Sequence, residues 1–148
     1  MKYLIFALVI CVAFPCHAEP TEKCSEREAF AAETVTDYLD SWKNVYLFFK
    51  QFNHCYDAAI AEGAQDAIQH LWVEKWASLP EMIALTNKDS AFKKFIWQSI
   101  RDETFPKNSF VRFVKHATRE CTDVAKEFCN AVIQESKRSN AQPFNKPE

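Results

Sequence analysis

The sequence predicts an all-α protein that forms a single compact domain of about six helices with two disulfides. Apolar residues recur at spacings of three and four along most of the chain, and no segment alternates apolar and polar residues as a strand does. The chain of 148 residues contains one Gly, whereas the tight turns of β-hairpins favour Gly. A chain of this length suits one domain with one hydrophobic core.

Residues 1–18 have the order of a secretory signal peptide: a positive residue, an apolar run and a small residue at the end. Lys2 supplies the charge, residues 3–14 form the run, and Ala18 ends it. The run is shorter than the ~20 apolar residues that span a bilayer, and no second run of that length follows. We therefore expect an exported protein, periplasmic or secreted, with no membrane span in its mature form.

The mature chain is expected to have two parts, a helical domain over residues 19–136 and a flexible polar tail over residues 137–148. The tail contains two prolines and few apolar residues, and chain ends of this kind are usually poorly ordered.

Four cysteines follow the signal segment, and an even number in an oxidising compartment predicts two disulfides. We expect Cys24 to pair with Cys55, because these residues flank two similar helices that can pack antiparallel. We expect Cys121 to pair with Cys129. On one unbroken helix these two would lie about 12 Å apart, whereas a disulfide needs Cα atoms within ~7 Å. The second pairing therefore predicts a turn near residues 122–123.

The first two helices have recognisable starts. Ser25 and Glu28 form a capping-box pattern that predicts the first helix, and Asp40 with Ser41 marks the second start. The expected apolar face of the first helix is Ala31, Val35, Tyr38 and Leu39. The second helix carries five aromatic residues, which predict core packing or, alternatively, an aromatic-lined pocket or exposed anchor: Trp42, Tyr46, Phe48, Phe49 and Phe52.

A long helix is predicted over residues 57–76, with Gly63 inside it. A Gly within a helix costs about 1 kcal/mol relative to Ala, so either a neighbouring helix approaches closely there or the helix starts later. Ser78 and Glu81 repeat the capping-box pattern around Pro80, which predicts a stop and a restart.

The remaining segments predict a short helix to about Thr86 and three further helices. The first is capped at Asp89 or Ser90, the next follows a break at residues 104–108, and the last is capped near residues 122–123. Residues 71–101 hold three of the four Trp, so we expect this stretch to form the packing centre of the domain.

Charge is distributed unevenly along the chain. Residues 19–89 carry 6 basic and 13 acidic residues, whereas residues 90–119 carry 7 basic and 2 acidic residues. The basic segment offers a candidate surface for an acidic partner: Lys93, Lys94, Arg112, Lys115 and Arg119. The simpler interpretation is solvated helix faces, or charge complementarity within the molecule.

A second candidate site is a polar stripe with a residue at every fourth position of the long helix: Glu62, Asp66, His70 and Glu74. Carboxylates on both sides of an imidazole could share a metal ion or act as an acid and a base. The simpler interpretation is the solvated face of an amphipathic helix.

No catalytic signature is present. The sequence lacks G-x-S-x-G, one Gly cannot build a phosphate-binding loop, and the histidines are isolated from one another. We therefore expect no enzyme activity, no cofactor and no bound metal. Nucleic acid is a poor candidate partner for an exported protein with a net charge of −2.

Several short patterns resemble a group of small exported all-helical bacterial proteins of unassigned function. These patterns are residues 61–71, Trp76-x-x-Leu79, Ala91-Phe92-x-x-Phe95 and Cys121-x7-Cys129. The resemblance implies fold and compartment, and it carries no catalytic motif. In general character the chain is also similar to periplasmic immunity proteins, which are small, helical, exported and disulfide-bonded.

The function that these observations favour is a non-enzymatic exported helical binding protein, such as an inhibitor or immunity factor that acts against another protein. The alternative is a carrier of a small apolar ligand in an aromatic-lined helical cavity. An enclosed apolar cavity would favour the carrier. A filled core with an exposed aromatic surface would favour protein binding.

The signal-peptide prediction is tested by the mass of the exported protein. We expect the intact mass to correspond to a chain that begins at Glu19, because Ala18 ends the signal pattern. A mass that retains residues 1–18 would contradict both export and the oxidising compartment that the disulfide prediction assumes.

Overall fold

The computed structural model describes residues 23–101 and 105–141, and it confirms the all-α fold. These residues form seven α-helices where the sequence predicted about six: α1 (Glu26–Thr36), α2 (Trp42–Phe52), α3 (Ala58–Glu74), α4 (Leu79–Lys88), α5 (Ser90–Ser99), α6 (Lys107–Arg119) and α7 (Lys126–Ala141). Three short 3-10 segments join them at Asn53–Cys55, Trp76–Ser78 and Asp123–Ala125. None of the described helices is long and apolar enough to cross a membrane. The predicted signal peptide lies outside the described residues.

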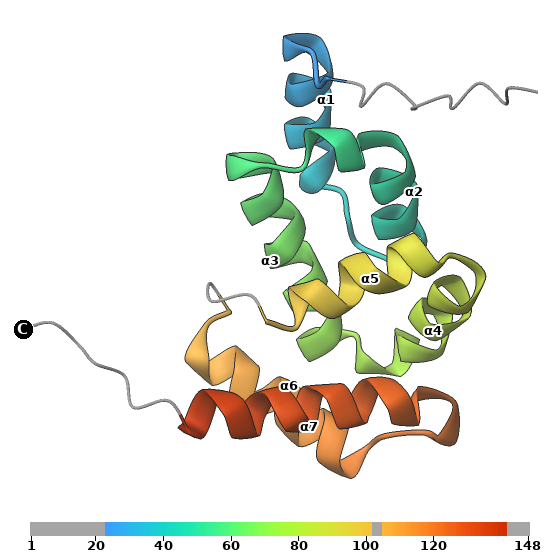
Figure 1. The fold of residues 1–148 in the computed structure, drawn as a ribbon, viewed down its shortest axis with the longest axis vertical. Coiled ribbons are helices and arrows are strands. Elements are labelled where there is room, and N and C mark those ends of the chain that lie inside the picture. Colours follow the sequence, from blue (N-terminus) through green and yellow to red (C-terminus); the bar gives the residue numbers. More distant parts are fainter. Residues whose placement is uncertain (1–22, 102–104, 142–148) are drawn as a thin grey trace, which may run out of the picture.

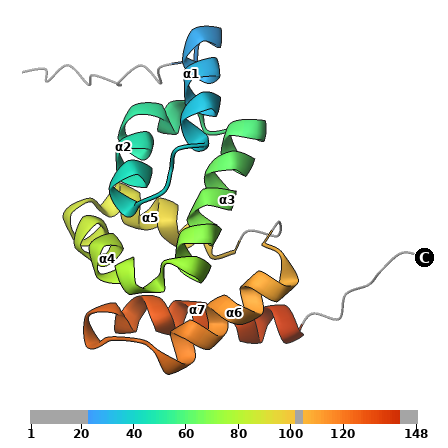
Figure 2. The same cartoon turned by 180° about the vertical axis from the view of Figure 1, so that it is seen from behind.

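The helices stack along the long axis of the molecule. α1 stands at one end, α6 and α7 cross each other at the opposite end, and α2 to α5 fill the space between (Figures 1 and 2). α3 connects the two ends, because it packs against α1 near its start and against α6 near its end. α4 packs mainly on α5 and α2.

The packing centre is the Trp72 ring at the end of α3. Its ring lies 4.7 Å from Phe113 in a stacked arrangement, 5.7 Å from Phe128 and 6.2 Å from Trp42. All four side chains are buried. The prediction that residues 71–101 hold the packing centre is confirmed, since Leu71, Trp72, Met82, Phe92 and Ile96 are each 0% exposed.

Both predicted disulfides are confirmed. Cys24 pairs with Cys55 at a Cα separation of 4.9 Å, and Cys121 pairs with Cys129 at 6.3 Å. α6 ends at Arg119 and the next segment begins at Asp123, so the chain turns where the second pairing required. On the chain-entropy model the two closed loops contribute about 3.7 and about 2.6 kcal/mol to folding.

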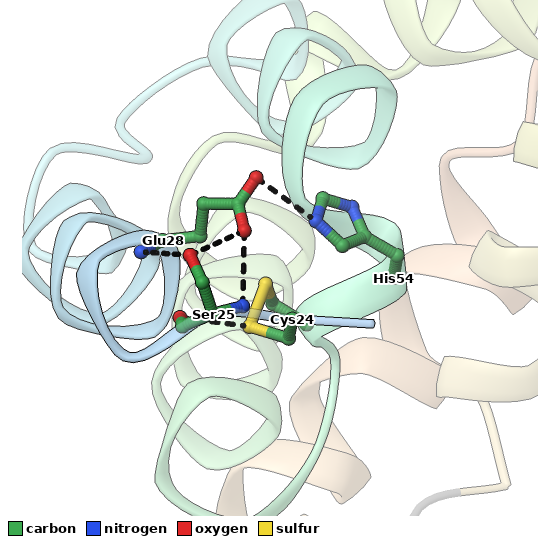
Figure 3. The surroundings of a disulfide bond; sticks show 5 residues. Cys24, Ser25, Glu28 and His54 are labelled. Carbon is green, nitrogen blue, oxygen red and sulfur yellow. Dashed lines mark hydrogen bonds and ion pairs between the residues drawn. A yellow bond between two sulfur atoms is a disulfide. The ribbon is translucent and has the colours of Figure 1, made fainter. Parts of the chain in front are cut away.

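The first disulfide lies beside the N-terminal cap of α1, as Figure 3 shows. The Ser25 hydroxyl accepts a hydrogen bond from the Glu28 amide, and the Glu28 carboxylate accepts one from the Ser25 amide at 2.9 Å, so the predicted capping box is present. His54 Nε2 lies 3.5 Å from the same carboxylate. The hydrogen bonds from Ser25, with a smaller contribution from His54, lower the pKa of Glu28.

Three local predictions were wrong. Tyr38 does not join the apolar face of α1, because that helix ends at Thr36 and leaves Tyr38 70% exposed in the following turn. Ser78 does not cap α4: its hydroxyl donates to the Lys75 carbonyl instead, although the predicted stop and restart occur. The helical domain does not end at residue 136.

α7 continues to Ala141, five residues into the predicted tail. No Gly or Pro interrupts residues 137–141, and the first Pro of the tail is Pro143. Arg138 also pairs with Glu135 one turn earlier, at 3.2 Å, which supports this last part of the helix. The rest of the predicted tail, residues 142–148, lies outside the described residues.

Gly63 allows α1 and α3 to approach closely. A Cβ atom added at this position would lie 2.6 Å from Thr36 Oγ1 and 3.0 Å from Thr36 Cβ. Thr36 cannot easily move aside, because its side chain is β-branched and its hydroxyl donates to the Glu33 carbonyl at 2.7 Å. The first of the two predicted explanations for this Gly, a close neighbouring helix, is therefore confirmed.

Replacing Gly63 with Ala is expected to destabilise the protein by about 1–3 kcal/mol, because the overlap with Thr36 outweighs the helix propensity of Ala. Thr36→Ala removes the nearest atom, so Gly63→Ala should cost less in that background. Urea unfolding of the two single variants and the double variant measures the difference. An equal cost in both backgrounds would show that the contact with Thr36 is not the cause.

Candidate functional site

The polar stripe on α3 lies on the surface, as an amphipathic helix predicts. Glu62, Asp66, His70 and Glu74 are all exposed. Three of them, Asp66, His70 and Glu74, border a shallow hollow of about 170 Å³ together with Gln69, Val73, Pro106 and Ser109. The hollow thus lies between the second half of α3 and the start of α6.

Glu74 forms an ion pair with Arg112, a residue of the predicted basic surface. The two guanidinium nitrogens donate to the two carboxylate oxygens at 2.7 and 3.0 Å. This hydrogen bonding lowers the pKa of Glu74 and raises the pKa of Arg112. Glu74 of the polar stripe and Arg112 of the predicted basic surface therefore hold each other in place. Their ion pair ties α3 to α6.

The five predicted basic residues come from two helices, Lys93 and Lys94 from α5 and Arg112, Lys115 and Arg119 from α6, and two of them pair with carboxylates of other helices. Lys93 donates to both oxygens of Glu127 on α7, at 2.8 and 2.9 Å, and lies 5.1 Å from the Trp97 ring. α5, which carries Lys93 and Lys94, packs mainly on α4, whereas α6 packs mainly on α7 and α3. Lys94, Lys115 and Arg119 are exposed and form no ion pair with the described residues.

The histidines lie in separate places. His116 stacks on Trp76 with ring centroids 5.4 Å apart and shares a hydrogen bond of 2.9 Å with Glu120. His54 lies beside Glu28, and His70 borders the hollow on α3. Within residues 23–101 and 105–141, no three His, Cys, Asp or Glu side chains are grouped so that they could hold a metal ion.

A second hollow, which the sequence analysis did not anticipate, lies on α1 at the end of the molecule. It has a volume of about 410 Å³, is open to solvent, and is lined by Phe30, Glu33, Thr34, Thr36, Asp37 and Ala59. Phe30 is 74% exposed. Glu26, Phe30, Glu33 and Asp37 follow one another at spacings of four, three and four, so they share one face of the helix.

A sequence signal for this surface exists, although it is weak. Phe30 is adjacent to the expected apolar face of α1 rather than part of it, and carboxylates flank it at helical spacing. A large aromatic residue out of phase with the buried face of its own helix is a candidate for contact with something outside the domain.

The fold and covalent framework define a small all-α protein with two disulfides. No protein-family model matches the chain, and no curated protein or solved structure is found to be similar to it. Two disulfides are the state of cysteines in an oxidising compartment, so the covalent structure is consistent with an extracellular or periplasmic environment.

The Glu74–Arg112 pair predicts a pH dependence. Because the folded pKa of Glu74 is lowered from 4.5, its contribution to stability is complete above pH 4.5 and is lost as the pH falls through the folded pKa. Glu74→Gln should therefore be less stable than the wild type at pH 7, and the difference should shrink in acid. Urea unfolding at several pH values measures this.

Glu62→Gln on the same helix is the matched control, because Glu62 forms no ion pair within the described part of the chain. A Glu74→Gln deficit that persists undiminished well below pH 4 would show that the ion pair with Arg112 is not its source.

Proposed function

We propose that this protein is a non-enzymatic exported binding protein whose ligand is another protein, and that it acts on that partner as an inhibitor or immunity factor. The observation that carries the proposal is an aromatic side chain exposed to solvent on α1, in a molecule whose central aromatic residues are buried against one another. Phe30 exposes 74% of its surface beside the hollow on α1. Aromatic residues are enriched at protein–protein interfaces, and Phe30 is the most exposed large apolar side chain among the described residues.

The filled core argues against an internal ligand. In α2, Trp42, Phe48, Phe49 and Phe52 are all buried, so its dense aromatic residues are packing residues rather than a pocket lining. Their rings contact other rings, for example Phe49 against Phe92 at 5.4 Å and against Phe95 at 5.2 Å. Aromatic rings in such contact leave little space between helices.

The carrier alternative would need an enclosed apolar cavity. The two hollows identified in the described residues are both open, and each is lined largely by polar side chains. A small apolar molecule in either would remain in contact with water and with carboxylates. Ligand pockets instead bury most of a small ligand against apolar groups, so protein binding is better supported than carriage.

The covalent framework suits a binding protein that works outside the cytoplasm. The disulfides tie down the start of α1 and the turn between α6 and α7, which lie at opposite ends of the molecule. A rigid surface loses less conformational freedom on binding than a mobile one. Inhibitors and immunity factors act by this kind of stoichiometric contact, and they need no catalytic group of their own.

Native mass spectrometry tests the proposal against the carrier. The disulfide-bonded mature protein, purified from its own envelope or culture fluid, should carry one protein of constant identity in a fixed ratio. The same chain, reduced and unfolded, is the control and should carry none. Recovery of a small apolar molecule in place of a protein would overturn the proposal in favour of the carrier.

A further inference from the structure

We propose that the hollow between the second half of α3 and the start of α6 binds an amide group of a partner protein, with Gln69 as its main contact (Figure 2). This inference adds a binding site to the proposed function, and it rests on that function for the source of the amide. Pockets for free small ligands usually measure about 300–1,000 Å³, whereas this hollow measures about 170 Å³. It therefore suits a single group that a partner inserts.

Gln69 lines the hollow although it is a buried polar residue, only 4% exposed. Its Nε2 atom has no hydrogen-bond partner in the described part of the chain. An unpaired buried donor destabilises a fold, because the hydrogen bond that it made to water is not replaced. Most buried polar groups are paired, so an exception beside a hollow indicates a donor kept for a ligand. The terminal torsion of a Gln side chain turns easily, so the amide can rotate to meet that ligand.

Gln65, one turn earlier on α3, is the natural comparison. It is 7% exposed, and its Nε2 donates to the Tyr56 hydroxyl at 2.7 Å and to Ser99 Oγ at 3.0 Å. Gln65 Oε1 is unpaired as well, but within the described residues it accepts nothing from Gln69. The bonds to Tyr56 and Ser99 hold the Gln65 amide toward α5, and Gln65 is not among the residues that line the hollow. Of the two glutamines, only Gln69 is therefore placed to meet a ligand there.

The hollow also contains an unpaired acceptor. Asp66 lines it and has no basic partner among the residues described. Glu62 and other exposed carboxylates share that property, so Asp66 gains its meaning only from Gln69 beside it. Glu74, the other carboxylate of the hollow, is neutralised by Arg112. The hollow therefore combines one unpaired donor with one unpaired carboxylate.

An amide matches this combination better than a charged group does. Its oxygen can accept from Gln69 while its N–H donates to Asp66. A lysine or arginine side chain brings donors only, which leaves the Gln69 donor unpaired. A carboxylate can accept from Gln69, but it is repelled by the unpaired charge of Asp66. Asn and Gln side chains and the peptide backbone all carry an amide, and the test separates these sources.

The direct test is an NMR titration of the ¹⁵N-labelled mature protein with four small compounds of similar size. Propanamide stands for a side-chain carboxamide and N-methylacetamide for a peptide group, while propanoate and propylammonium are the charged controls. The side-chain NH₂ group of Gln69 gives its own signals and reports directly on the site. We expect the amides to shift these signals, and the two ions to shift them far less. The amide that causes the larger shift identifies the source, side chain or backbone.

Three variants connect the response to the named residues. Gln69→Met keeps the length of the side chain, so it should abolish the response and raise the urea midpoint, because an unpaired buried donor is removed. Asp66→Ala should weaken amide binding by about tenfold, because a charge-assisted hydrogen bond is lost. Gln65→Met is the matched control. It should lower the urea midpoint, because the bonds to Tyr56 and Ser99 are lost, and leave the response unchanged.

Equal shifts with all four compounds, or with none, would overturn the proposal. So would a lower urea midpoint for Gln69→Met, which would show that the fold itself pairs this amide. A long-lived water detected at the Gln69 NH₂ group, and displaced by neither amide, would assign the hollow to solvent and overturn the proposal too. Shifts of the Gln69 signals on simple dilution would place a second copy of this chain there instead of a partner.

Gln69→Met also separates this proposal from the proposed function. If mass spectrometry identifies a partner, the variant should raise its Kd by about tenfold, the effect of one lost hydrogen bond in a buried contact. A partner that binds the variant with wild-type affinity overturns the site on α3 and leaves the proposed function standing. Amide binding at Gln69 in a protein that carries no protein partner would support the site and count against the proposed function.

Discussion

The fold depends on the burial of Trp72 at the point where α2 and α4 meet α6 and α7. Its ring contacts rings from α2, α6 and α7, and its Nε1 donates to the sulfur of Met82 on α4 at 3.5 Å. One side chain therefore joins five helices, including its own. Removing a buried Trp of this kind costs about 3–5 kcal/mol, a large fraction of the stability of a domain of this size. The disulfides support this core from outside, at the two ends of the stack.

Local signals were enough to predict much of the fold. Ser25 and Asp89 cap helices as expected. A cap involves only a side-chain oxygen and the free amide groups two or three residues later, so the sequence alone is enough to predict it. The cysteine pairing was also predicted, because Cys24 and Cys55 flank two helices that can pack antiparallel, and a turn near residues 122–123 brings Cys121 and Cys129 within reach of each other. The exposure of Tyr38 was not predictable, since it depends on α1 ending at Thr36 rather than one turn later.

The candidate sites were harder to predict, because they depend on contacts between distant residues. Arg112 lies 38 residues from Glu74, and Lys93 lies 34 residues from Glu127. The sequence shows an acidic stripe and a set of basic residues, and only the packing of α3 on α6 reveals that Glu74 of the first pairs with Arg112 of the second, while Lys93 pairs with Glu127 on α7. Charge complementarity within the molecule was one of the predicted interpretations, and these two ion pairs support it.

This internal pairing changes which charges remain available to a partner. Glu74, Glu127 and Glu135 meet basic residues across helix contacts, whereas Glu33 and Asp37 on α1, like Glu62 and Asp66 on α3, meet no cation among the residues described. α1 is also held at both ends, by the disulfide and capping box near Ser25 and by the close contact of Thr36 with Gly63. A helix fixed in this way can present an exposed ring and two carboxylates without further ordering, so little conformational freedom remains to be lost when a partner binds. Local rules that a sequence breaks without compensation within the fold mark functional surfaces, and on this criterion the exposed Phe30 makes α1 a candidate beside the two surfaces that the sequence suggested.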